Sequence, residues 1–419
     1  MVRTDEFPLP PSPFIRAALK TTVERIALEL NKPQPRAPEW SEFEWRVAMA
    51  VAVMHGVSGL LAGRLQWHGP ESWQTFLAEQ LHQGQLRQQR TRELLDVIDV
   101  AAVQAQLPLM ALKGSALLNL GLYAPGERPM SDIDLLCRVS DFEATEQLIE
   151  ATGYEAGAAI WKHREYAPTG IGKERAFGEH IRNPIKIELH DHIAERLPLR
   201  ETAITEQLFP REAQAGLNAY PSLAALMRHL LLHAAGNVCM QGIRLIHLHD
   251  IAALAGRLHA EDWNELLQPG DRWMGPPLAF TDHCFPGRIP QKQLGLALQQ
   301  CAPLLRRASV RYRLDKHSIS RWSMPRLPGL EWSDSMAEAG RCIATRFYPG
   351  RQALAQDKES ALRQIQLTTT GWAQTPRWQK AFRVLAGRAS HPMTLYSLQR
   401  ALGYRPDSPA HIAPMRAAL

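Results

Sequence analysis

The pattern of apolar and polar residues changes twice along the chain, at Leu107 and after Leu197. Before Leu107 the pattern favours helices, and a Pro-rich segment precedes them. The predicted helices span residues 14–31, 40–65 and 71–105. We therefore expect residues 1–105 to form an N-terminal helical region.

Short apolar or alternating stretches between residues 106 and 200 predict strands separated by helices. The predicted order is a strand at 107–112, a helix at 114–122, a strand at 131–139, a helix at 140–152 and strands at 174–181 and 185–190. Ser140 and Glu143 have the spacing of a capping box, and Gly153 is placed to end the helix. Residues 106–200 are thus the expected mixed α and β core.

Helical patterns return after Leu197 and continue to the end of the chain. The predicted order is a helix from Ser222 to Gly236, a helix at 242–258, a Pro- and Gly-rich loop at 269–290 and further helices at 291–419. We expect residues 201–300 to pack on the core and residues 301–419 to form a separate C-terminal helical region.

Charge separates this last region from the rest. Residues 301–419 contain 19 basic and 7 acidic side chains, whereas residues 1–300 contain 29 basic and 35 acidic ones. The asymmetry fits an anionic partner, such as a nucleic acid, that contacts residues 301–419. It fits a solvated basic helical surface equally well.

The cysteines and the apolar runs limit the class of protein. The five cysteines are far apart and include no CxxC pair, which argues against cysteine-bound zinc and a disulfide framework. The N-terminus has no apolar signal-peptide core, and the longest apolar run, residues 47–63, is interrupted by polar and Gly residues. We expect a cytoplasmic protein with no membrane span.

The alternation within residues 131–139 contains the strongest chemical signal. Ile133, Leu135 and Val139 are expected on one face of the strand, and Asp132 and Asp134 on the other. Residues two apart on a strand are separated by roughly 6.5 Å, so the two carboxylates can converge on one hard cation, or on two held about 3.5–4 Å apart. This pattern is typical of phosphoryl or nucleotidyl transfer, where positioning and charge neutralisation supply most of the catalysis.

Other residues extend this candidate site. Gly114-Ser115 follows the first strand, and the N–H groups of such a turn can bind phosphate. Lys113 and Arg128 are placed to offset phosphate charge. Glu188 lies on the strand at 185–190 and is the expected third carboxylate ligand, as well as a candidate general base.

Other motifs point elsewhere or to packing. His229 and His233 are four apart on a predicted helix, but no Glu follows the first, so packing is the favoured interpretation over metal binding. No dinucleotide-binding GxGxxG and no phosphate-binding GxxxxGK[ST] motif is present. His249 and Asp250 are expected to pack against the core.

Three segments resemble nucleotidyltransferases of the DNA polymerase beta superfamily, and within it the bacterial group of uncharacterised nucleotidyltransferases. They are the Lys-Gly-Ser-Ala-Leu-Leu motif at 113–118, Tyr123 with Arg-Pro-Met-Ser-Asp-Ile-Asp-Leu-Leu at 128–136, and Ile-Glu-Leu-His at 187–190. The resemblance spans about residues 20–260. It implies an α+β protein whose polymerase-beta-like core, a mixed sheet with flanking helices, lies between the N- and C-terminal helical regions.

The resemblance also implies a reaction. Asp132, Asp134 and Glu188 would be catalytic and bind two Mg²⁺, for which Mn²⁺ can substitute, and Gly114 and Ser115 would contact the phosphates. The expected activity moves a nucleoside monophosphate from an NTP, most simply ATP, to an acceptor hydroxyl or phosphate and releases pyrophosphate. The acceptor stays open between a peptide or protein, RNA and a small molecule. The alternatives are a toxin-type enzyme that modifies tRNA, a phosphotransferase that uses the same site, and a nucleotide-binding module without catalysis.

Overall fold

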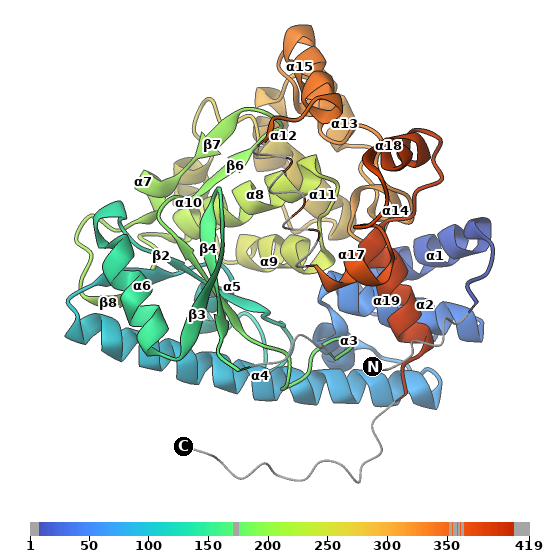
Figure 1. The fold of residues 1–419 in the computed structure, drawn as a ribbon, viewed down its shortest axis with the longest axis horizontal. Helices are drawn as coiled ribbons and strands as arrows, with labels where there is room; N and C mark the ends of the chain where they lie inside the picture. The colour runs from blue at the N-terminus through green and yellow to red at the C-terminus, as the bar shows by residue number, and fades with distance from the viewer. Residues whose placement is uncertain are drawn as a thin grey trace.

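A mixed six-stranded sheet forms the centre of the computed structural model, which describes residues 8–170, 176–351, 364–405 and the single residues 354, 358 and 361 (Figure 1). The strand order is β3-β4-β5-β2-β1-β8. The strands are β1 (Pro108–Ala111), β2 (Asp132–Leu136), β3 (Tyr154–Ile160), β4 (His163–Pro168), β5 (Lys186–His190) and β8 (Gly216–Asn218). A separate pair consists of β6 (Ala194–Arg196) and β7 (Glu201–Ala203).

The pairing of β2 with β5 sets the position of the acidic residues. The two strands are parallel, and Asp134 pairs with Glu188 in the register. β1 lies antiparallel on the other side of β2, and β8 extends the sheet beyond β1. The strand β8 comes from the part of the chain that was expected to be helical, so the sheet includes residues beyond 200.

The two faces of the sheet pack into different cores. Leu109, Ile133, Leu135, Ile187 and Leu189 are buried in a core shared with the long helix α4 (Glu71–Gln104) and with α6 (Phe142–Ala151). The opposite face carries the acidic side chains and joins the large helical core through Met110, Leu112 and Leu136. Buried strands on both sides of β2 therefore hold the acidic face on a rigid support.

Helices from both the N-terminal and the C-terminal parts of the chain surround the sheet. Those before β2 are α1 (Ser12–Asn31), α2 (Glu42–His55), α3 (Ser58–Arg64), α4 and α5 (Gly114–Asn119). The helix α7 (Thr205–Leu208) lies between β7 and β8, and those after β8 are α8 (Leu223–Cys239), α9 (Leu245–Ala255), α10 (Ala260–Leu266), α11 (Gly275–Cys284), α12 (Gln291–Gln300), α13 (Pro303–Ser309), α14 (Leu314–His317), α15 (Met336–Phe347), α17 (Ile365–Thr369), α18 (Arg377–Leu385) and α19 (Pro392–Leu402). In Figure 1, α4 runs along one side of the sheet, and α19 lies beside α2.

Several predicted elements differ from the structure. The helix expected at 40–65 is divided into α2 and α3, because Gly56 adopts a left-handed conformation (φ +66°) that ends α2. Residues 176–181, the described part of the strand expected at 174–181, form turns that pack against α4. The loop expected at 269–290 contains α11.

Two local predictions were also wrong. The Ser140 hydroxyl donates to Asp141 instead of capping α6, because a short 3₁₀ turn (Val139–Asp141) precedes the helix. Val139 is 72% exposed instead of facing the core, since β2 ends at Leu136. By contrast, Ser222 caps α8 as predicted and accepts the N–H of Ala225 at 3.0 Å.

No single helix among the described residues has both the length and the apolar composition to cross a membrane. The helices α2 and α3 have sufficient length and apolar composition only when taken together, and the chain bends by 114° between them.

Candidate functional site

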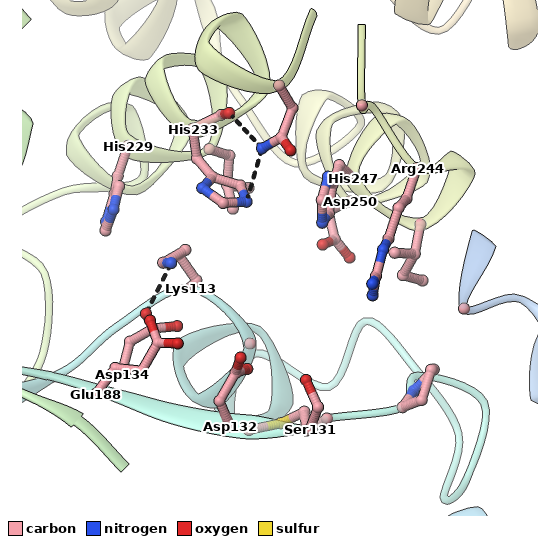
Figure 2. A pocket seen from close by; sticks show the side chains of 18 of the residues that line it. Lys113, Ser131, Asp132, Asp134, Glu188, His229, His233, Arg244, His247 and Asp250 are labelled. Carbon is pink, nitrogen blue, oxygen red and sulfur yellow. Dashed lines mark hydrogen bonds and ion pairs between the residues drawn. The ribbon is translucent and has the colours of Figure 1, made fainter. Parts of the chain in front are cut away.

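A cavity of about 410 Å³ lies between the acidic face of the sheet and the helices α8 and α9. Figure 2 shows its two sides: the carboxylates of Asp132, Asp134 and Glu188 on the strands, and histidines and Arg244 on the helices. Lys113 lies between them. The sheet thus supplies the negative side of the cavity, and the helices supply a side rich in nitrogen.

The three predicted carboxylates line this one cavity. Asp132 and Asp134 lie on the same face of β2, and the register of β5 places Glu188 directly beside Asp134. Burial together with the Asp134 charge raises the pKa of Asp132. Burial and the charges of Asp134 and Asp132 raise the pKa of Glu188 to about 8. The cluster therefore carries negative charge that a cation would stabilise.

Lys113 is the nearest cation to these carboxylates. Its Nζ lies 2.8 Å from Asp134 Oδ1, and His190 Nε2 lies 3.2 Å from the same oxygen. Burial opposes ionisation of Asp134, but the Lys113 ammonium and the His190 side chain outweigh it and hold the pKa of this carboxyl well below its usual range. Burial also opposes the charge of Lys113, yet Asp134 and Glu188 raise the pKa of Lys113. Lys113 and Asp134 thus form a buried ion pair at the centre of the cavity.

The structure gives Arg128 a different partner from the phosphate expected for it. Its Nε and Nη2 donate to the two carboxylate oxygens of Asp250 at 2.9 and 2.8 Å, in a pair that is almost completely buried. The Asp250 Oδ1 atom also accepts the hydroxyl of Tyr123 at 2.6 Å. Arg128 borders the cavity, but its charge is already compensated by α9. Asp250 packs against the core as the sequence predicted.

Gly114 and Ser115 lie at the start of α5, as expected. A Cβ atom on Gly114 would come within 2.5 Å of Arg128 Nη1, so the close approach of this guanidinium alone requires glycine here. The Ser115 hydroxyl is buried and has no hydrogen-bond partner among the described residues. Gly114 borders the cavity.

The helical side of the cavity contains residues that the sequence analysis placed in the core or did not consider. His229 and His233 on α8 line the cavity, although packing was the favoured interpretation. Burial and the Lys113 charge hold the pKa of both imidazoles well below the usual range, so both are neutral. Asn237 donates to His233 Nε2 at 3.2 Å.

Two further cations reach the cavity, and periodicity gave no signal for either. Arg244 precedes α9 and points toward Asp132 and Ser131 in Figure 2. Burial lowers the pKa of Arg244, and the charges of Asp132 and Glu179 oppose that effect. Lys162, in the turn between β3 and β4, pairs with Glu195 at 2.8 Å. Only the folded chain brings these two side chains to the carboxylates.

The fold and the cavity together define a mixed α+β protein with an acidic cluster and an adjacent lysine on one face of a six-stranded sheet. The uncharacterised nucleotidyltransferase family matches residues 41–274, more than half of the chain, and the chain belongs to this family. No curated protein and no solved structure matches the chain. Among the described residues that line the cavity, all but Ile319 lie within the matched range. The family's class of activity, nucleotidyl transfer, therefore applies to the part of the chain that builds the cavity.

Proposed function

We propose that this cavity binds a nucleoside triphosphate with Mg²⁺ and transfers the nucleoside monophosphate to an acceptor hydroxyl or phosphate, with release of pyrophosphate. ATP is the NTP we expect. The observation that carries the proposal is the convergence of three carboxylates from two neighbouring parallel strands, within the part of the chain that matches the nucleotidyltransferase family.

The donor set fits a magnesium site. Asp132, Asp134 and Glu188 supply carboxylate oxygens, the ligands that Mg²⁺ prefers. Burial and the neighbouring carboxylates raise the pKa of both Asp132 and Glu188, so a bound cation would favour their charged forms. Two Mg²⁺ bound by these residues would neutralise phosphate charge and activate the acceptor oxygen. Mn²⁺, which also accepts carboxylate oxygens, is expected to substitute.

The side chains of the cavity have separate roles in this proposal. The acceptor oxygen forms a bond to the α-phosphorus as the bond between the α-phosphorus and the bridging oxygen breaks, and pyrophosphate leaves. Glu188 is placed to accept the proton of an acceptor hydroxyl. Lys113, Arg128 and Arg244, which all line the cavity, offset the charge of the triphosphate. Gly114 and Ser115 contact the phosphates by analogy with the superfamily.

The acceptor is the open part of the proposal. The basic region at 301–419 supports an anionic acceptor such as RNA, and steep loss of acceptor binding with salt is the expected sign of phosphate contacts. A peptide, a protein or a small molecule would show a weaker dependence. The toxin-type enzyme that modifies tRNA is the RNA case of the same reaction.

Labelled nucleotides test the reaction. Purified protein with Mg²⁺ is incubated with each NTP labelled at the α- or γ-phosphate and with cell extract as the source of acceptors. We expect the α label to appear in an acceptor, and Asp132→Asn and Glu188→Gln to reduce labelling by at least about 100-fold, as when a group that stabilises transition-state charge is removed. Glu143→Gln, an exposed carboxylate on α6, is the matched control and is expected to retain activity.

Other outcomes would assign a different function. Transfer of the γ label identifies a phosphotransferase. Binding of NTP and Mg²⁺ with no labelled product in any extract supports a nucleotide-binding module. Wild-type protein that neither binds NTP nor labels an acceptor rules out the proposed activity.

A further inference from the structure

Two histidines lie against Glu188 on the cavity side of the sheet. His163 begins β4 and His190 ends β5, the strand beside it. Glu188 Oε2 lies 3.2 Å from His163 Nδ1 and 3.9 Å from His190 Nε2. All three ligand atoms are within 4.8 Å of one another. Two imidazole nitrogens and one carboxylate oxygen therefore surround a common point.

One of these nitrogens makes no hydrogen bond in the described part of the chain, although Glu188 Oε2 lies 3.2 Å from it. The His163 side chain is only 8% exposed, and its Nδ1 atom is buried without a hydrogen bond. Buried polar atoms are nearly always satisfied, so an unpaired nitrogen that points at a carboxylate indicates a missing ligand. His190 Nε2, the second nitrogen, contacts Asp134 Oδ1 at 3.2 Å. Asp134 thus lies close enough to add a further oxygen.

The two separations measured from Glu188 are short enough for one metal ion. Nitrogen and oxygen ligands lie about 2.0–2.2 Å from Zn²⁺, so two ligands of one ion are separated by at most about 4.4 Å. The separations from Glu188 to the two histidines fall below this limit. The neighbouring cations are already paired, Lys162 with Glu195 and Lys113 with Asp134. Because a carboxylate already compensates each lysine, their positive charges oppose metal binding at the three ligand atoms only weakly.

We propose that His163, Glu188 and His190 bind a divalent transition-metal ion of the Zn²⁺ and Co²⁺ type, in preference to Mg²⁺. Imidazole nitrogen is a good ligand for such ions, whereas Mg²⁺ is bound mainly by oxygen. The site shares Glu188 with the magnesium site proposed above but does not depend on nucleotidyl transfer. It would give this cavity two kinds of metal site, one defined by aspartates and one by histidines.

Metal titration without nucleotide tests the site directly. Full-length, metal-free protein is titrated with Co²⁺, followed by its visible absorption, and with Zn²⁺ by equilibrium dialysis in the presence of excess Mg²⁺. We expect one ion per chain that Mg²⁺ does not displace. His163→Phe retains a ring but has no nitrogen. Loss of an outer-shell partner weakens metal binding by up to about 100-fold, so loss of this direct ligand is expected to weaken it by at least about 100-fold.

Two control variants separate this site from its surroundings. His192→Phe removes an imidazole two residues beyond His190 that pairs with Asp191 and lies outside the cluster, so it is expected to bind Co²⁺ like the wild type. Asp132→Asn should abolish nucleotide labelling and leave Co²⁺ binding intact, which distinguishes failure of the magnesium site from failure of this one.

X-ray absorption of the Zn²⁺-loaded wild type provides a test that needs no variant. Scattering from two imidazoles on the bound ion is expected. The proposal is overturned if the wild type binds neither ion, if His163→Phe binds as tightly as the wild type, or if no imidazole scattering is found.

Discussion

The backbone of Lys113 is held in an uncommon conformation by the half-buried side chain of Tyr220. Its φ of +43° is sparsely populated for a residue with a side chain. The Lys113 N–H donates to the Tyr220 hydroxyl at 3.2 Å, and this hydroxyl forms a hydrogen bond of 2.7 Å with His229 Nδ1. Tyr220→Phe would leave both groups buried and unpaired. We expect the free energy of unfolding, measured with urea, to fall by about 1–3 kcal/mol.

The same substitution should also reduce nucleotidyl transfer, because Lys113 would lose the contact that positions it beside Asp134. Tyr348 is 86% exposed, so Tyr348→Phe is the matched control and should change neither stability nor activity. Equal stability of Tyr220→Phe and the wild type would show that the tyrosine does not support Lys113.

At the scale of single residues, the sequence predicted those side chains whose position follows from local alternation. Asp132 and Asp134 share a face because they are two apart on one strand, and Glu188 faces the same cavity because β5 alternates in register with β2. The ion pair of Arg128 with Asp250 could not be predicted, because the two residues are distant in the sequence. His163 was missed because its neighbour Glu188 lies on another strand.

The loop that joins α5 to β2 is attached to α9 by the buried pair of Arg128 and Asp250. Removal of one partner from such a pair leaves an uncompensated buried charge. We therefore expect Asp250→Asn to lower the free energy of unfolding by about 3–5 kcal/mol, measured by urea denaturation.

The exposed pair of Arg196 and Glu201, separated by 3.9 Å, provides the comparison. Glu201→Gln is expected to cost less than about 1 kcal/mol, because solvent screens both charges. A loss of similar size in the two variants would mean that the pair with Asp250 does not hold the loop.

At the scale of elements, prediction succeeded where burial imposed a clear pattern. The strands β1, β2 and β5 and the helices α1, α4 and α8 were all expected close to where they lie. The strands β3 and β4 were missed, since of the side chains described in β4 only Tyr166 is fully buried and the alternation is therefore weak. The strand expected at 174–181 was wrong in its described part, where Gln80 and Arg87 of α4 bind the backbone of turns.

At the scale of the whole molecule, distant parts of the chain meet at the cavity. Lys113 precedes α5 and the carboxylates come from β2 and β5, whereas Arg244 and three histidines come from residues 229–247, after the last strand of the sheet. The C-terminal helix α19 returns to pack on α2, and Arg46 donates to the carbonyl of Tyr404 at 2.8 Å. No periodicity within one segment contains this information, so the composition of the cavity could not be predicted from the pattern alone.

His55 connects three of these distant parts and makes stability depend on pH. Its Nδ1 accepts the N–H of Leu245 at 2.9 Å, and its Nε2 lies 2.9 Å from the Ser320 hydroxyl. The imidazole is fully buried, and burial together with the Arg244 charge lowers the pKa of His55 from 6.5 to about 3. Protonation would place a hydrogen on Nδ1 opposite the N–H that it accepts.

Because the pKa is lower in the folded state, the unfolded chain takes up this proton first as the pH falls. The stabilisation is complete above about pH 6.5 and is lost progressively toward about pH 3. Within that window one such histidine changes the free energy of unfolding by up to about 1.4 kcal/mol per pH unit.

His55→Gln should therefore show a shallower decline of stability between neutral pH and the lower end of the window, measured by urea denaturation at several pH values. Other histidines whose pKa is lowered, including His249 and His391, contribute to both proteins, so the difference in slope isolates His55. Parallel curves for the two proteins would show that His55 titrates normally and does not link the three segments.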